Sequence, residues 1–207
     1  MMDKNLEGVL ALGQNDIIQK LGISTSNIDA HEYAIFAGKC LAFLIANTDI
    51  FGDLLVSLIG FSVGSLVAYY CAYDLFRLGK LDKLLSLSFV GSPLKISQLD
   101  SDLILNMGGR VFNVYSHDDY LLRYLTVVDS DQEEPIGLRK FTRADFIDLN
   151  SVTPEIGKNT QLVRNLNLSE WVKSHSEFKF HSFIILDFLY KVISYNLFLL
   201  RIESLTS

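Results

Sequence analysis

A short, nearly continuous apolar run that breaks into a glycine-flanked turn constrains this chain more than any other feature. Residues Leu54–Ile59 read Leu-Leu-Val-Ser-Leu-Ile, which is the pattern of a strand buried on both faces of a parallel sheet. A helix pattern follows from Ser65 to Leu78, and Gly79 comes next as a natural helix C-cap. A buried strand that leads directly into a helix predicts an α/β fold.

The rest of the chain continues this alternation. Three further strands are predicted, at Leu84–Val90, Val111–Tyr115 and Val163–Leu168. Helices are predicted at His31–Ala46, Ser97–Met107 and Tyr120–Thr126, and in the apolar stretch from Phe183 to Leu200. This order implies an α/β-hydrolase-like, mostly parallel sheet with helices on both faces.

Two stretches carry no clear secondary-structure pattern. Residues 1–29 show no periodicity, and the polar stretch 129–160 is interpreted as an excursion or lid-like loop. In the first helix, an apolar stripe of mostly small residues is predicted to pack inward: Ala34, Ala37, Gly38, Leu41, Leu44 and Ile45. With 207 residues and no linker of low complexity, the chain is expected to form a single domain over 1–207.

Composition excludes several classes of function. The net charge is −6 and no run of Lys or Arg forms a basic stripe, so no nucleic-acid partner is expected. Cys40 and Cys71 lack metal-ligand spacing and are interpreted as two reduced core cysteines. Reduced cysteines favour an intracellular location, either cytoplasmic or peripheral on membranes. We predict neither a metal nor a cofactor.

The turn after the first strand has the form G-x-S-x-G, in Gly60-Phe61-Ser62-Val63-Gly64. Between a strand and a helix this motif predicts a nucleophile elbow with Ser62 in a strained conformation. The two glycines are expected to let strand and helix approach without a Cβ clash. The backbone N–H of Val63 is then placed to stabilise an oxyanion. A plain strand-to-helix turn of small residues is the alternative.

A serine nucleophile needs a base, and histidine is the usual one at neutral pH. His31 precedes the motif on a helix and is interpreted as structural, and His117 follows the third strand. His175 lies in the loop after the last strand, where the order Ser, acid, His puts the base. His181, at the start of the final helix, is the alternative.

The acid should follow the strand before that loop. Asp118 and Asp119 both come just after Val111–Tyr115, and a carboxylate there can bond the histidine Nδ1–H and fix its tautomer. Periodicity does not choose between the two. An Asp pair in this place is also typical of a turn, or of the N-cap for a helix from Tyr120 onward.

Three parts of the sequence resemble one known family. They are residues 37–42 with 56–65, residues 114–122, and residues 165–168 with 174–178. The resemblance, over roughly 31–190, is to the family of the transmembrane and coiled-coil domain-containing protein four. Its members are α/β-hydrolase-like, lipase-type proteins that are often membrane-associated.

The resemblance implies particular site residues. The family's Tyr-Ser-x-x-Asp-aromatic pattern selects Asp119 over Asp118, and its Gly-His-Ser-Asp-Tyr type of sequence favours His175 over His181. Ser174 stands where the family usually has glycine. The family's membrane-spanning helices are not recognised in this sequence. Its early strands, one of which leads to the second oxyanion donor, are not recognised either. The chain is therefore expected to be an N-terminally truncated relative that lacks the first strands.

Two functions of different classes follow. The first is a serine hydrolase of esterase or lipase type that cleaves an acyl or lipid ester through Ser62, Asp119 and His175. The second is a catalytically inactive hydrolase-fold protein that serves as an interaction or trafficking module at membranes. The retained order of serine, acid and histidine favours the first, and the unrecognised oxyanion strand favours the second.

Overall fold

A computed structural model describes residues 30–48, 50–52, 54–128, 133–142, 145, 163–191 and 193–194, so residues 1–29 lie outside it. Four strands form one sheet in the order β1-β2-β3-β4. They are β1 (Val56–Phe61), β2 (Leu84–Val90), β3 (Val111–Tyr115) and β4 (Val163–Asn167). Every neighbouring pair is parallel. The predicted α/β class and parallel sheet are confirmed.

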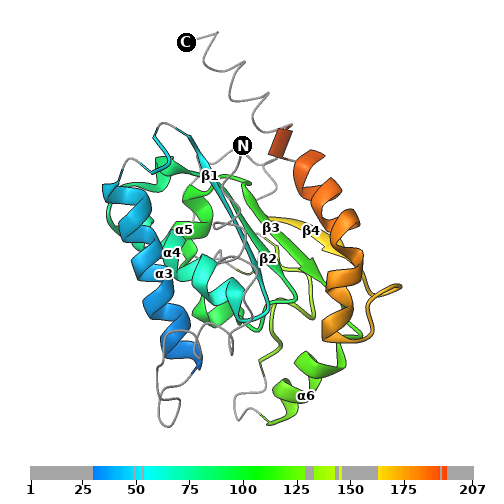
Figure 1. Cartoon of the computed structure of the whole chain (residues 1–207). Coiled ribbons are helices and arrows are strands. Elements are labelled where there is room, and N and C mark those ends of the chain that lie inside the picture. Colours follow the sequence, from blue (N-terminus) through cyan, green and yellow to red (C-terminus); the bar gives the residue numbers. More distant parts are fainter. Residues whose placement is uncertain are drawn as a thin grey trace, which may run out of the picture.

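Helices cover both faces of this sheet (Figure 1). On one face lie α3 (Ala30–Asn47), α4 (Gly64–Arg77) and α5 (Ser101–Asn106), which share an apolar core with Leu87 and Phe89 of β2. On the other face, the helical segment 182–191 packs Ile185 and Leu189 against β3. The other elements among the described residues are α6 (Tyr120–Val128) and three 3-10 helices, η1 (Leu81–Lys83), η2 (Ile96–Gln98) and η4 (His175–His181).

Strand β1 differs from its predicted burial. We expected Leu54–Ile59 to be buried on both faces, but the strand runs from Val56 to Phe61 and buries one face only. Leu58 is buried, whereas Ile59 and Phe61 are 49% and 43% exposed. Within the described residues, β1 pairs with β2 alone, and its core contacts lie on the side of α3 and α4. Strands β2 and β3 are buried along their whole length.

Helices α3 and α4 pack so closely that their backbones nearly touch. Its buried residues are Ala34, Gly38, Ala42 and Ile45. A Cβ on Gly38 would lie 2.8 Å from the Val67 carbonyl oxygen in α4, so glycine is needed where the two helices touch. The predicted stripe is therefore right in part. Ala37 and Leu44 are exposed, because the contact with α4 is narrower than the apolar stripe in the sequence.

The helix predicted at Ser97–Met107 is two elements, η2 and α5. The chain turns between them at Asp100, whose carboxylate accepts a 2.8 Å hydrogen bond from the Leu103 N–H. That bond makes Asp100 the N-cap of α5 and begins a new helix there. The Tyr69 hydroxyl accepts from the Asp100 N–H at 2.8 Å and fixes the turn against α4.

Part of the stretch 129–160, interpreted as lid-like, is packed. Within residues 133–142, Ile136 and Phe141 are fully buried. The Asn113 side chain on β3 donates a 3.0 Å hydrogen bond to the Ile136 carbonyl oxygen and ties this segment to the sheet. Most of the remaining stretch lies outside the described residues, so the lid interpretation stays a prediction. No helix in the described part of the chain is long and apolar enough to cross a membrane.

The two cysteines lie in different environments. Cys71 is fully buried in α4, and burial raises the pKa of its thiol to about 12. Cys40 is exposed, so the interpretation of both as core cysteines is wrong for Cys40. The reason is helical spacing, because the buried positions of α3 around it are Gly38 and Ala42.

This difference predicts selective alkylation, since the thiolate is the reactive form of cysteine. Iodoacetamide at about pH 8 should modify Cys40 and leave Cys71 unmodified in the folded chain. Both should react after unfolding in guanidinium chloride. Peptide mass spectrometry measures the two sites separately, and equal rates in the folded chain would contradict the burial of Cys71.

Candidate active site

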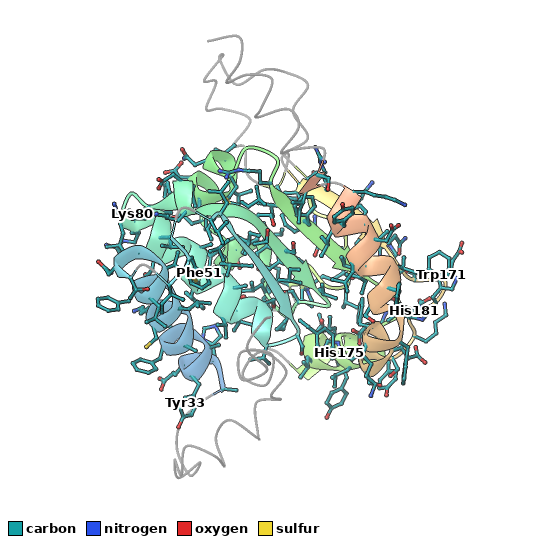
Figure 2. The ribbon with its side chains drawn as sticks, turned by 45° about the horizontal axis from the view of Figure 1, so that its top comes forward. Tyr33, Phe51, Lys80, Trp171, His175 and His181 are labelled. Carbon is teal, nitrogen blue, oxygen red and sulfur yellow. The ribbon has the colours of Figure 1, made fainter. Side chains whose placement is uncertain are left out.

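Ser62, Asp119 and His175 meet at one edge of the sheet. Because the strands are parallel, their carboxyl ends lie together, and the three residues follow β1, β3 and β4. The His175 Nε2 is 2.7 Å from Ser62 Oγ. The His175 Nδ1 is 2.6 Å from Asp119 Oδ2. Figure 2 shows His175 near α6, at the start of η4.

Ser62 occupies a strained turn between β1 and α4. Its φ is 53°, and no other described non-glycine residue has a positive φ. The Ser62 N–H donates a 3.0 Å hydrogen bond to the Val90 carbonyl oxygen at the end of β2. A left-handed conformation is unfavourable for serine and persists only where surrounding contacts hold it.

The two glycines of the motif are not equivalent. A Cβ on Gly60 would lie 2.5 Å from the Gly64 carbonyl oxygen and 2.6 Å from the Ser65 nitrogen, so the close approach of strand and helix requires Gly60. A Cβ on Gly64 would meet nothing within 4 Å. The expectation that both glycines relieve a clash is therefore wrong for Gly64, because it is the start of α4 and faces open space.

The Asp119 carboxylate is fully buried and has two roles. Its Oδ1 accepts hydrogen bonds from the backbone N–H groups of Leu121 and Leu122, at 3.1 Å and 3.3 Å. Those bonds cap the first turn of α6. Its Oδ2 remains for His175. The helix cap and the contact with the histidine that was predicted for the acid thus fall on the same residue.

The bonding of Asp119 determines the tautomer of His175. An ionised carboxylate only accepts hydrogen bonds, so the His175 Nδ1 carries the proton and donates to Asp119. The neutral ring then has its Nε2 lone pair free. That lone pair faces Ser62 Oγ, which donates its hydroxyl proton to it. This is the arrangement in which a histidine can accept a proton from serine.

The two alternative residues lie elsewhere. The Asp118 carboxylate is bound at 2.7 Å by the Lys173 ammonium. The Lys173 hydrogen bond lowers the Asp118 pKa, and the charges of Lys173 and Arg123 add to the shift. His181 ends η4 and lies apart from His175 in Figure 2. It is the His175 ring that contacts Ser62.

The remaining histidines do not join the site. His31, on α3, makes an edge contact with the Tyr70 ring at 5.9 Å. His117 is exposed in the turn after β3, where its N–H donates to Ser169 Oγ at 2.8 Å. Their places fit the interpretation of His31 as structural and leave His175 as the histidine between a serine and a carboxylate.

The loop that carries Asp119 is bonded to the loop that carries His175. Ser116 Oγ donates to the Val172 carbonyl oxygen at 2.5 Å. The Tyr120 N–H donates to the Lys173 carbonyl oxygen at 3.2 Å. The Asp118–Lys173 ion pair joins the same two loops on the outside. The two hydrogen bonds hold the loops of Asp119 and His175 together before any ligand binds, and the exposed ion pair adds little to them.

Ser174 leaves the start of η4 unstrained. Its φ is −120° and its ψ is 141°, an extended conformation that any residue adopts. The Glu177 carboxylate accepts from the N–H groups of Ser174 and Lys173, and these bonds lower the Glu177 pKa. Serine therefore adopts the backbone conformation before His175 without strain.

Three neighbours of the His175 ring were not singled out from the sequence. The Phe61 ring stacks on it with centroids 5.1 Å apart, and the Phe178 ring meets it edge-on at 6.1 Å. Gly91 has a φ of 51°, and a Cβ there would lie 3.3 Å from His175 Cε1. The only sequence signals were the variable position of the motif for Phe61 and the strand-ending glycine for Gly91.

Comparison with known proteins gives a family without an assigned activity. No curated protein and no solved structure matches the chain. The family model described as "Protein of unknown function (DUF726)" matches residues 26–192, a stretch that includes all four strands and Ser62, Asp119 and His175. Because this match covers most of the sequence, the chain belongs to the DUF726 family.

Proposed function

We propose that this chain is a serine ester hydrolase of the α/β-hydrolase type. One observation carries the proposal: Ser62 Oγ lies 2.7 Å from His175 Nε2, while Asp119 Oδ2 lies 2.6 Å from Nδ1 of the same ring. A nucleophile bonded to a base, which is oriented in turn by a third group, is the signature of nucleophilic catalysis. The strained backbone at Ser62 supports the same interpretation.

In the proposed reaction, Ser62 Oγ attacks the ester carbonyl carbon as His175 Nε2 takes the hydroxyl proton. Asp119 stabilises the imidazolium that forms. The oxyanion accepts a hydrogen bond from the Val63 N–H. His175 then gives its proton to the leaving alcohol. The alcohol is released, and an acyl group remains bound to Ser62 Oγ as an acyl-serine. A water molecule then attacks the acyl carbon as His175 takes one of its protons. His175 returns that proton to Ser62 Oγ as the carboxylic acid leaves, which restores the site.

The surroundings of the site favour an acyl or lipid ester as substrate. Helix α6 begins next to Asp119 and exposes Tyr120 and Tyr124, at 63% and 64%. The helical turn that begins at His175 leads to Phe180 and Phe183, which are 73% and 88% exposed. These exposed aromatic side chains belong to α6, η4 and the residues that follow it, the elements next to Asp119 and His175, and they support contact with an apolar ligand or surface if they form one patch. Peripheral contact with a membrane surface is part of this proposal.

The resemblance to the family of the transmembrane and coiled-coil domain-containing protein four supports the same assignment. The positions that carry the resemblance include Ser62, Asp119 and His175. The lipase-type activity of that family comes to this chain only as part of the proposal.

A fluorophosphonate probe tests the proposal, because it reacts with an activated serine and not with an ordinary one. We expect one adduct on the folded chain, on the peptide that contains Ser62, and none on Ser62→Ala. Heat-unfolded protein is the second control.

The other candidate function is an inactive hydrolase fold that acts as an interaction module at membranes. The exposed apolar residues of α6 and of the segment after η4 favour it as much as they favour a lipid ester. The same experiment separates the two functions. If the folded chain is never labelled at Ser62 and hydrolyses no ester, the proposed enzymatic function is overturned. The inactive interaction module is then the function that the structure supports.

A further inference from the structure

Two buried hydroxyl groups lie behind Ser62. Ser65 and Ser92 are both fully buried, and their Oγ atoms are 2.6 Å apart. Ser65 Oγ donates to the Ser62 carbonyl oxygen at 2.5 Å. At the other end, the Leu94 N–H donates to Ser92 Oγ at 3.2 Å. Together these groups form a hydrogen-bonded chain that ends on the candidate nucleophile's own backbone.

The groups at the two ends of this hydrogen-bonded chain determine which hydroxyl donates to which. A backbone N–H only donates and a carbonyl oxygen only accepts. The single Ser65 hydroxyl proton therefore points to the Ser62 carbonyl oxygen, so Ser92 must donate to Ser65 Oγ. Each hydroxyl in such a chain is both donor and acceptor, and successive bonds polarise one another.

The Ser62 carbonyl belongs to the same peptide unit as the Val63 N–H. The described chain has no cis peptide bond, and in a planar trans peptide the C=O and N–H point in opposite directions. The carbonyl oxygen faces Ser65, which also donates its backbone N–H to it at 2.9 Å. The Val63 N–H therefore points away from the buried hydroxyls, and it has no acceptor among the residues that the structure describes.

We infer that Ser65 is a positioning residue that aims the Val63 N–H, and that Ser92 acts through Ser65. The inference rests on the proposed function, in which that N–H binds the oxyanion. The hydrogen bond from Ser65 Oγ holds the Ser62 carbonyl oxygen in place. Because the peptide unit is planar, this bond also fixes the direction of the Val63 N–H. Polarising the carbonyl also makes the N–H of the same unit a better donor. The hydrogen bonds of the Ser65 side chain go to the Ser62 carbonyl oxygen and to Ser92, and not to His175 or Ser62 Oγ.

Ser65→Ala should lower kcat for a short-chain p-nitrophenyl ester about 10-fold, less than the roughly 10²–10³-fold loss on removing an oxyanion donor. KM should not change, because the oxyanion exists only in the transition state. The pH dependence of kcat should also be unchanged, because the substitution leaves Asp119 and His175 as they are. Ser92→Ala should have a smaller effect of the same kind, because Ser65 keeps its bond to Ser62.

Ser86→Ala is the matched control. Ser86 is also a buried serine, and its hydroxyl donates at 2.9 Å to Ser57 Oγ on the neighbouring strand. Its loss removes a partly buried serine–serine hydrogen bond, since Ser57 is exposed, and leaves the hydrogen bonds of the Ser62 peptide intact. We expect kcat within about twofold of the parent, because its hydroxyl is coupled to no group of the site.

A second measurement does not depend on activity. In ¹⁵N–¹H NMR spectra, the resonance of the Val63 amide should shift in Ser92→Ala, although the hydrogen bonds of the Ser92 side chain go to Ser65 and Leu94. The same resonance should not shift in Ser86→Ala. The inference is overturned if kcat is unchanged in Ser65→Ala and the resonance of the Val63 amide does not shift in Ser92→Ala. In that case the activity of the parent still supports the proposed function. If the parent is inactive, the proposed function falls, and the Val63 amide alone decides whether Ser65 holds this peptide.

Discussion

Asp119→Asn is expected to lower ester turnover about 10⁴-fold, nearly as much as Ser62→Ala. The amide oxygen can still accept from the Leu121 and Leu122 N–H groups, so the cap of α6 is kept. The amide nitrogen then faces His175 Nδ1 and donates to it. The ring proton moves to Nε2, which can no longer accept the Ser62 proton.

Asp118→Asn is the matched control for this substitution. It makes the same chemical change one residue earlier, where the carboxylate is partly exposed and bonds Lys173. Exposed ion pairs contribute little, so turnover should stay within about twofold of the parent. Ester hydrolysis by both variants, with circular dichroism to verify folding, gives the comparison. Equal activity would remove the carboxylate from the mechanism, and a larger loss at Asp118 would reverse the assignment.

Gly60→Ala should disrupt the turn at Ser62, whereas Gly64→Ala should be tolerated. The new Cβ at Gly60 would collide with backbone atoms of Gly64 and Ser65, which cannot move without breaking the start of α4. We expect a loss of about 3 kcal/mol or more in the free energy of unfolding. At Gly64 the space is open, and alanine should change stability by no more than about 1 kcal/mol, in the favourable direction.

Urea unfolding of the two variants measures this difference directly. Both substitutions add one methyl group to the same motif, so composition and unfolded-state effects are closely matched. An equal loss of stability in the two variants would contradict this account, because alanine lowers the entropy of the unfolded chain and by that effect alone stabilises the fold. A stable Gly60→Ala would contradict the close approach of β1 and α4.

Much of the fold follows from local pattern alone. The strands β2 and β3 occupy the predicted residues, because they are buried on both faces and therefore read as continuous apolar runs. The turn at Ser62 is equally local, since Gly60 is needed by atoms within five residues of it. The order of Ser62, Asp119 and His175 in the sequence, each after a strand, already predicts that they meet when the strands are parallel.

Other properties depend on contacts between distant segments. Asp118 and Asp119 are chemically identical neighbours, and only the loop at Val172–His175 gives one of them a histidine and the other a lysine. The open face of β1, the exposure of Cys40 and the split of α5 from η2 likewise depend on which element packs against each residue. The spacing of apolar residues in the sequence indicates which side of a helix or strand is apolar. It does not indicate how much of that side a neighbouring element covers. The hydroxyl chain from Leu94 to Ser62 joins the ends of β1 and β2 through the side chains of Ser65 and Ser92. The sequence pattern places the first in a helix and the second after a strand but does not show that they meet, so only the tertiary structure reveals the chain.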